Sequence, residues 1–500
     1  MLDAESAAAY VRKHWKTAQQ QQQQGHAPPD GGGDDAAATA APLSGGVINR
    51  VFRVGPHVVL KQALPYVHAV GPSFPLSRAR MDAEAAAMAL AAEAAAAEAE
   101  AATATATTAT AIARPPVLLH YDRAQSVLLT ACLPETFASM HDALLAGDLP
   151  AAPVAAPLFR LLARLQRPAV GAVDDASARA AAASALKNDD MVRANLDVVL
   201  RQPFRLQSQQ PPAPPPPHLA RETQWLLADP SVRAAAAALD EHYARAARRA
   251  SERSNGLAFA FNDAHPGNVF VAGVVPAEQA LEGLLRSAAE EAAEAAALGG
   301  APPPAPFLID WEFAAPGPAE FDVGTFAGNL LLAALALPRV PLWGRKSSEA
   351  ATTKAGGGDD ASKAAAACRR AQQAWLLHEA AGAWRAHEAA MAEVAGREEQ
   401  KEQERWAVAW AGAAVLRQMI GLHRHPLLLK VAEDEDGSGA LEETERSCLA
   451  LGRAMLLAVA RAEEDGREAP LPPGAVATFG AAAAVAHELA RSLDDLYPPP

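Results

Sequence analysis

The sequence predicts an α+β fold in which a strand-rich first third is followed by a mainly helical remainder. Short alternating or apolar runs, which are typical of strands, occupy residues 49–55, 57–64 and 116–133. A second strand pair, "NVFVAG" and "FLIDWEF", comes later in the chain. From Phe326 onward the pattern is that of amphipathic helices, at Leu330–Ala336, Ala374–Ala392 and Trp406–Leu422.

Composition narrows the class of protein. The chain has 500 residues, a net charge of −14 and a pI near 5.5, which argues against a nucleic-acid or anionic-membrane partner. Its three cysteines form no CxxC pair and predict a reducing compartment. No apolar run has the pattern of a membrane helix, and Ser6–Tyr10 is interpreted as the first helix of the folded protein. A cytoplasmic location is therefore predicted.

Low-complexity segments interrupt the patterned ones. They are rich in Ala, Glu, Gln, Gly or Pro, and we interpret them as solvent-exposed insertions. The alanine tracts favour helix but show no amphipathic stripe by which to dock. The insertions are expected at about residues 19–41, 84–113, 207–217, 276–306, 343–367 and 432–441.

One short stretch, "FAFNDAHPGNVFVAG", places Asp263 five residues before Asn268. Protein kinases use the spacing Asp-x-x-x-x-Asn, in which the Asp accepts the proton of a hydroxyl and the Asn helps to hold magnesium. The alternative is a polar turn shaped by Pro266 and Gly267 without any chemistry.

A second acidic pair ends the strand in "FLIDWEF". Asp310 and Glu312 are two residues apart, so an extended chain directs both carboxylates to one face. Oxygen ligands of this kind suit a hard cation such as Mg²⁺. Two solvated acids at a strand end are the alternative.

Lys61 lies inside the apolar strand "HVVLKQAL", where its charge needs a partner or water. Kinases pair such a lysine with nucleotide phosphates and a helix carboxylate. The candidates are Asp82 and Glu84, of which only one can reach Lys61 because residues two apart on a helix do not share a face. Upstream, Gly46 closes a Ser-Gly-Gly turn whose amides could cover phosphates, or which is an ordinary turn.

Each signal is weak alone, but their order along the chain is informative. A glycine turn, a strand lysine, a helix acid, Asp-x-x-x-x-Asn and a strand ending in Asp follow one another as in kinases. Neither His378 nor His387 has the second His of a zinc-protease helix, and no Gly-x-Ser-x-Gly motif supports a hydrolase.

Three stretches carry a resemblance to a known family: "VLKQALPYVHAVGPSFPLSRARMDA", "IDWEFAAPGPAEFDVGTFAGNLLLA" and "WAGAAVLRQMIGLHRH". The chain resembles the 5-methylthioribose kinases, within the aminoglycoside phosphotransferase and choline kinase branch of the protein-kinase-like fold. The resemblance implies two lobes with a hinge near Pro134. A small, mainly antiparallel N-lobe would span residues 1–133 and a larger helical C-lobe residues 134–500.

The resemblance also implies roles for residues. Asp263 would be the catalytic base, Asp263 and Arg417 would contact the sugar, and Asn268, Asp310 and Glu312 would bind magnesium. The nucleotide would be bound by Gly46, Asn49, Lys61, Asp82 and Leu133.

The chain departs from the family at several of its positions. Phe261-Asn262 replaces a His-Gly pair, and Gln418 replaces the second of two arginines. The Asp-Pro-Glu of the family is Asp-Trp-Glu here, and Phe74 stands where a Trp is usual.

The expected activity is transfer of the γ-phosphoryl group of ATP, with Mg²⁺, to the 1-hydroxyl of 5-methylthioribose in methionine salvage. The partners would then be ATP and a small sugar, with a homodimer left open. The alternatives are a related kinase acting on choline, homoserine or an aminoglycoside, and a non-catalytic binding protein of the same fold.

Overall fold

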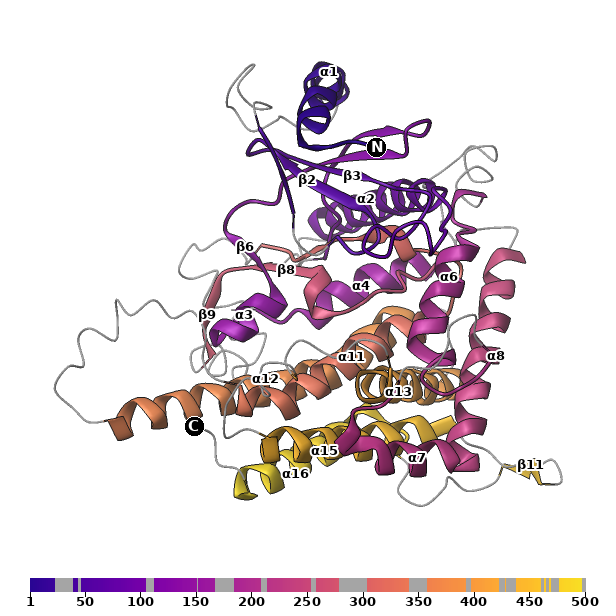
Figure 1. Cartoon of the computed structure of the whole chain (residues 1–500), viewed down its shortest axis with the longest axis vertical. Helices are drawn as coiled ribbons and strands as arrows, with labels where there is room; N and C mark the ends of the chain where they lie inside the picture. Colours follow the sequence, from indigo (N-terminus) through magenta and orange to yellow (C-terminus); the bar gives the residue numbers. More distant parts are fainter. Residues whose placement is uncertain are drawn as a thin grey trace.

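A computed structural model describes most of the chain (Figure 1). It leaves out residues 23–38, 44–45, 105–111, 151, 167–183, 208–213, 253–257, 278–303, 341–357, 393–396, 422–427, 429–437, 460–462, 465–466, 469–475 and 497–500. All structural statements below concern the remaining residues.

The first sheet is five-stranded and antiparallel throughout, as the resemblance implies, and its strands lie at the alternating runs near the start of the chain. Its order is β1-β2-β3-β5-β4, so β3, which carries Lys61, is the central strand. The predicted strands are confirmed, including the β4–β5 hairpin, whereas the short β1 was not predicted. The bounds are β1 Ala40–Pro42, β2 Arg50–Val54, β3 Val58–Gln62, β4 Leu118–Asp122 and β5 Val127–Ala131.

This sheet lies between two helices (Figure 1). On one face, Val58 and Leu60 of β3 pack with side chains of α1 (Ala4–Gln22). Because side chains alternate along a strand, Lys61 points to the other face, toward α2 (Arg80–Ala104). The predicted first helix is confirmed, and it covers the outer face of the sheet.

The prediction of a solvent-exposed insertion at residues 84–113 is wrong for the first part of that range. Helix α2 runs through it, and Ala83, Ala87, Met88 and Ala91 are fully buried or nearly so. These residues are three and four apart and form one face of the helix. The stripe was invisible in the sequence because alanine occupies both the buried and the exposed face, so hydrophobicity does not vary around the helix.

A second, three-stranded sheet has the order β10-β8-β6. The predicted pairing of "NVFVAG" with "FLIDWEF" is confirmed as antiparallel β8 (Val269–Ala272) and β10 (Phe307–Leu308). The unpredicted third strand, β6 (Phe137–Ser139), comes directly after the predicted hinge. Two further strand pairs are short: β7 (Asp148–Pro150) with β9 (Val274–Pro276), and β11 (Glu463–Glu464) with β12 (Arg467–Glu468).

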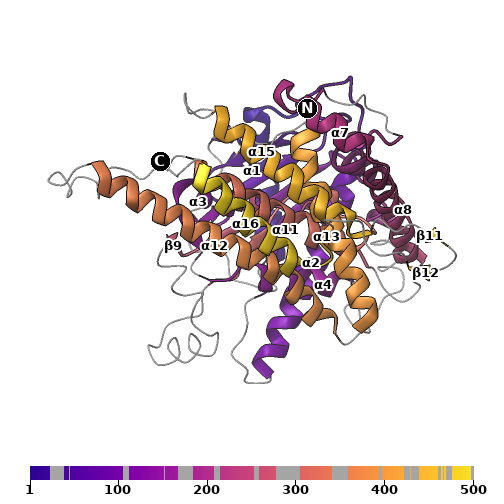
Figure 2. The same cartoon turned by 90° about the horizontal axis from the view of Figure 1, so that it is seen from below.

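The remainder is helical, and the three predicted helical segments lie in α11, α12 and α13. In Figure 2, which views the molecule from below, α15 and α16 lie in front of this group and α8 runs along one side. The helices are α3 Met140–Ala146, α4 Ala155–Gln166, α6 Asp189–Leu196, α7 Ala220–Ala228, α8 Pro230–Glu252, α11 Ala319–Ala336, α12 Gly358–Met391, α13 Arg397–Ile420, α15 Ser438–Leu456 and α16 Phe479–Leu496. The predicted α+β class, antiparallel strands first and helices after, is confirmed.

Helix α11 is the centre of the helical part. A Cβ at Gly328 would come within 2.6 Å of the Ala411 carbonyl oxygen, so glycine there lets α13 approach closely. In the described part of the chain, one helix, Ala319–Arg339, is long and apolar enough to cross a membrane, but its apolar 18-residue window is wholly buried inside the protein, as in a core helix. The cytoplasmic location and the homodimer stay predictions.

Glu320, at the start of α11, is buried, and burial raises its pKa to about 7. Between the ordinary carboxyl pKa and pH 7 the folded state therefore holds a proton that the unfolded chain has lost, and stability falls as pH rises. We expect Glu320→Gln to raise the free energy of unfolding at pH 8 by up to about 3 kcal/mol and to have little effect at pH 4. Urea denaturation at both pH values measures this difference.

The control for this prediction is Glu398→Gln, because the Glu398 side chain is exposed. It should leave the pH dependence unchanged. An equal effect of Glu320→Gln at both pH values would contradict the assignment.

The predicted insertions are partly described. Apart from 84–113, where α2 is described, the middle of each falls outside the described residues, whereas β1, the start of α12 and the start of α15 occupy ends that were predicted to be insertion. The first sheet and α2 lie wholly before residue 133. The lobe boundary itself stays a prediction.

Candidate active site

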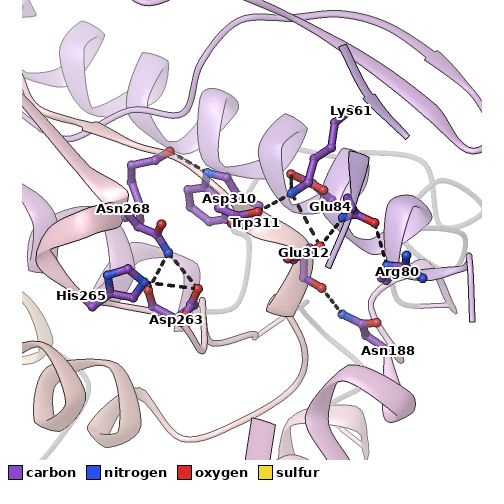
Figure 3. Close-up of polar contacts among 12 residues, drawn as sticks. Lys61, Arg80, Glu84, Asn188, Asp263, His265, Asn268, Asp310, Trp311 and Glu312 are labelled. Atoms are coloured by element: carbon purple, nitrogen blue, oxygen red, sulfur yellow. Dashed lines mark hydrogen bonds and ion pairs between the residues drawn. The ribbon is translucent and has the colours of Figure 1, made fainter. Parts of the chain in front are cut away.

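The centre of the site is an ion pair between the first sheet and α2. The Lys61 Nζ lies 2.9 Å from a Glu84 carboxylate oxygen, and both side chains are buried. Of the two acids that the sequence left open, Glu84 is the one that reaches Lys61 (Figure 3).

Asp82 is therefore wrong as the partner of Lys61, and the structure gives it other partners. Its carboxylate accepts a hydrogen bond from the Tyr121 hydroxyl at 2.6 Å and pairs with Arg123 at 3.0 Å. Two residues along a helix turn the side chain by about 200°, so Asp82 faces the β4–β5 edge while Glu84 faces β3. The role of Asp82 as a nucleotide ligand stays a prediction.

Asp310 and Glu312 join Lys61 from the other sheet. Lys61 donates a hydrogen bond to Asp310 and lies 3.6 Å from Glu312. Asp310 has a left-handed backbone with φ of 65°, which is uncommon for a residue other than glycine. Such backbone strain is typical of functional sites, and here the left-handed residue lies two positions after β10 with its carboxylate on Lys61.

Asn49 and Arg80 complete this cluster. Asn49 is buried, donates to the Glu312 carboxylate and accepts from the Arg80 Nε at 2.9 Å. Arg80 also donates to the Leu64 carbonyl at 2.9 Å. A Cβ at Gly46 would come within 2.8 Å of the Asn49 carbonyl oxygen, so only glycine fits there without displacement.

The cluster carries more negative than positive charge. Two cations, Lys61 and Arg80, face the three carboxylates of Glu84, Asp310 and Glu312. Burial alone would lower the pKa of Lys61, but the surrounding carboxylates raise it well above its ordinary value. Burial and the neighbouring carboxylates raise the pKa of Glu312 well above its ordinary value.

One oxygen from each of the three acids lies within 4.8 Å of the other two, which is a spacing that a single cation could bridge. Carboxylate oxygens are the ligands that Mg²⁺ takes, and a further cation would relieve the repulsion among these acids. The carboxylates of Asp310 and Glu312 thus fit a magnesium ion once the Lys61 ammonium, which lies between them, has turned away.

The predicted Asp–Asn pair forms one compact loop next to this cluster. The Asn268 Nδ2 donates to the Asp263 carboxylate at 2.8 Å, and the His265 Nε2 lies 3.7 Å from the same carboxylate. The backbone carbonyl of Asn268 accepts a hydrogen bond from the Ile309 backbone N–H at 3.0 Å, which joins the loop to the residue before Asp310. The residues that were predicted to converge therefore lie in two hydrogen-bonded groups, directly linked through the β8–β10 pair.

Asp322 on α11 anchors the start of this loop. Its buried carboxylate accepts the backbone N–H groups of Phe261 at 2.8 Å and of Asn262 at 2.7 Å. Burial raises the pKa of Asp322 to about 7, although both hydrogen bonds favour the ionised form. The backbone immediately before Asp263 is thereby tied to the buried helix α11.

Phe261 and Asn262, the two residues before Asp263, make buried structural contacts. Asn262 adopts φ of 66°, the left-handed conformation that glycine takes readily and Asn tolerates. Its side chain also accepts from the Tyr243 hydroxyl at 2.8 Å and donates to the Phe313 carbonyl at 3.1 Å. Phe261 is wholly buried against Trp311, with ring centroids 4.8 Å apart.

Two substitutions separate the roles of Asn262. Asn262→Gly keeps the left-handed backbone and loses the side-chain hydrogen bonds, whereas Asn262→Ala loses both. We expect Asn262→Ala to be less stable than Asn262→Gly by about 1 kcal/mol, measured by thermal or urea unfolding. An alanine variant as stable as the glycine variant would show that the backbone conformation costs nothing at this position.

Arg417 and Leu133, the two remaining predicted residues, lie on other elements. Arg417 lies near the end of α13, and its buried Nε has no hydrogen-bond partner among the described residues. Burial lowers the pKa of Arg417, and the negative charge of Asp263 opposes that shift. Gln418, next to it, is buried. Leu133 follows β5 at the connection to the second sheet.

Sequence reasoning missed Arg80, Asn188 and Asp322. The Asn188 Nδ2 donates to the carbonyls of Glu312 at 2.7 Å and Ala314 at 3.1 Å and so supports the turn after Asp310. Arg80 stands one turn before Glu84 on α2, but nothing in "SRARMDAE" distinguishes it from Arg78. Asp322 could have been suspected, since an acid inside the apolar run "EFDVGTF" needs buried partners.

Comparisons with known proteins give the following relatives. No family profile matches the chain. A methylthioribose kinase of Yersinia pseudotuberculosis is 26% identical over 441 residues, covering 85% of this chain and 88% of that protein. One from Yersinia enterocolitica is 26% identical over 438 residues, covering 84% of this chain and 89% of that protein. One from Pectobacterium atrosepticum is 25% identical over 308 residues, covering 60% of this chain and 61% of that protein.

Among solved structures, a streptomycin–ATP complex of APH(2″)-IIa covers 90% of this chain and 99% of its own, with 11% identity and a TM-score of 0.29. At that score the likeness supports no conclusion about this chain. The sequence relatives, by contrast, extend over most of both chains, as the resemblance carried by the three motif stretches predicts. The chain is a homologue of curated bacterial methylthioribose kinases and is a phosphotransferase enzyme.

Proposed function

We propose that this enzyme transfers the γ-phosphoryl group of ATP to the 1-hydroxyl of 5-methylthioribose. The observation that carries the proposal is the convergence of Lys61, Glu84, Asp310 and Glu312 beside the Asp263–Asn268 loop. These are the parts that phosphoryl transfer needs, since it depends on positioning and charge neutralisation more than on covalent chemistry.

Each residue has a proposed role. Asp263 accepts the proton of the sugar hydroxyl while the hydroxyl oxygen bonds to the γ-phosphorus. ADP leaves with the electrons of the broken P–O bond. Lys61 holds the nucleotide phosphates, and Asn49 with the backbone at Gly46 borders the same region. The connection at Leu133 holds the adenine by backbone groups, and Arg417 contacts the sugar.

Magnesium would be held by Asp310, Glu312 and the amide oxygen of Asn268. Its charge neutralises that of the transferring phosphate. The Asn268 amide nitrogen donates to Asp263, so one side chain serves both the base and the metal position. In the described structure Lys61 occupies the space between the acids, and with nucleotide bound it would turn from Asp310 to the phosphates.

The proposal is tested by incubating the purified chain with ATP, Mg²⁺ and 5-methylthioribose and detecting the 1-phosphate by mass spectrometry. Choline, homoserine and an aminoglycoside serve as competing acceptors. We expect the highest kcat/KM with 5-methylthioribose. A higher value with another acceptor would identify a sister kinase. Stabilisation by Mg-ATP without turnover of any acceptor would indicate a binding protein.

A further inference from the structure

A cavity of about 630 Å³ opens between α2, α4 and α12. Its lining combines small residues, mainly alanines, with longer charged side chains. The charged or titratable residues are Glu98, Arg160, Arg164, His378, Glu379 and Arg385.

This cavity is separate from the active-site cluster. Glu98 lines it from α2, fourteen residues after Glu84 on the same helix. At 1.5 Å per residue, the two positions are about 21 Å apart along the helix axis. None of the residues that surround Lys61 or Asp263 lines the cavity.

The lining is positively charged although the chain as a whole is acidic. Three arginines and two acids, Glu98 and Glu379, line it, and Glu379 already accepts hydrogen bonds from the protein backbone. The buried Glu379 carboxylate accepts the N–H groups of Val154 at 2.9 Å and Ala155 at 2.7 Å, where α4 begins. Those amides and the helix dipole offset its charge, which leaves Glu98 as the one remaining acid of the lining.

Two of the arginines lack an ion-pair partner among the described residues. Within the described residues, neither Arg164 nor Arg385 forms an ion pair or a side-chain hydrogen bond, and both are exposed at the cavity. The charge of Arg385 acts on both His378 and Glu379, since it adds to the burial that lowers the His378 pKa and opposes the burial that raises the Glu379 pKa. The side chains of His378, Glu379 and Arg385 on α12 are thus close enough to interact electrostatically.

The size and chemistry of the cavity suit a small anion. Its volume is in the range of small-molecule sites. The alanines at 155, 156, 386, 389 and 390 and Gly382 leave space that larger side chains would fill. Guanidinium groups bind phosphate in a bidentate manner, and two unpaired guanidiniums beside a histidine offer several donors.

We propose that this cavity is a second binding site, distinct from the active site, for a small organic phosphate. Arg164 of α4 and Arg385 of α12 bind the phosphate oxygens from opposite walls, and the alanine-lined floor receives the uncharged part of the molecule.

Isothermal titration calorimetry tests this with inorganic pyrophosphate as the probe. The full chain is held in saturating Mg²⁺ and a non-hydrolysable ATP analogue, so that a phosphate site in the nucleotide region is blocked. We expect wild type to bind pyrophosphate, and Arg164→Ala/Arg385→Ala to bind roughly tenfold to a hundredfold more weakly. Arg370→Ala is the matched control, because Arg370 is an exposed arginine of α12 that does not line the cavity.

Equal affinity in all three proteins, or no binding by wild type, would overturn the proposal. Circular dichroism and thermal unfolding show whether the double variant is folded. If it is not, Arg385→Gln alone replaces it, and its affinity must fall below that of Arg370→Ala. Neither outcome depends on which acceptor the enzyme phosphorylates.

Discussion

Asp263→Asn is expected to lower turnover by about 10²–10⁴-fold while leaving the affinity for Mg-ATP nearly unchanged. The amide cannot accept the proton of the acceptor hydroxyl, but it has almost the same shape as the carboxylate. The carboxylate of Asp263 touches Asn268 and His265 and is not part of the Lys61 cluster, so nucleotide binding should persist. Steady-state kinetics and a thermal-shift titration with Mg-ATP measure the two effects separately.

A surface carboxylate provides the control for this prediction. Asp190→Asn alters an acid that pairs with Arg193 on the exposed side of α6, and its kcat should equal that of wild type. Undiminished turnover in Asp263→Asn would remove the base from the proposed mechanism. A parallel loss of Mg-ATP binding would instead make Asp263 part of the nucleotide or metal site.

Lys61→Met is expected to lower the free energy of unfolding by about 3–5 kcal/mol at pH 8, besides weakening nucleotide binding. The substitution leaves the buried acids Glu84 and Glu312 with Arg80 as their remaining cation. Burial already raises the pKa of both acids, so protonation at low pH relieves the repulsion and the loss should shrink toward pH 5. Urea denaturation at the two pH values gives both numbers.

A double-mutant cycle tests whether the ion pair is the cause. Lys61→Met combined with Glu84→Gln removes both charges and should recover part of the lost stability, whereas additive losses would contradict the pairing. Lys401→Met is the matched control, because Lys401 pairs with Glu398 on an exposed helix face and its loss should change stability little.

Much of the architecture was predictable because it depends on local patterns. Alternation along β2, β3 and β5 located the first sheet, and helical periodicity located α11, α12 and α13. The pairing of β8 with β10 was predicted across a long intervening segment because both runs are apolar and bounded by turn residues. Asp263 and Asn268 lie within one short turn, as their spacing predicts. The extended chain assumed for Asp310 and Glu312 is wrong, because Asp310 is left-handed and a 3-10 turn follows it, although both carboxylates still reach Lys61.

By itself, the sequence determined the α+β order of elements, the strand lysine and the acids that accompany it, because these depend on residue type and spacing over a few positions. Only the tertiary structure decided which helix acid meets Lys61, that Asn49 and Arg80 join them, and that the alanines of α2 are core. Lys61 meets Glu84 and Asp310 across 23 and 249 positions of the chain. Contacts over such separations depend on how helices and sheets pack together, and no periodicity within one segment records that arrangement.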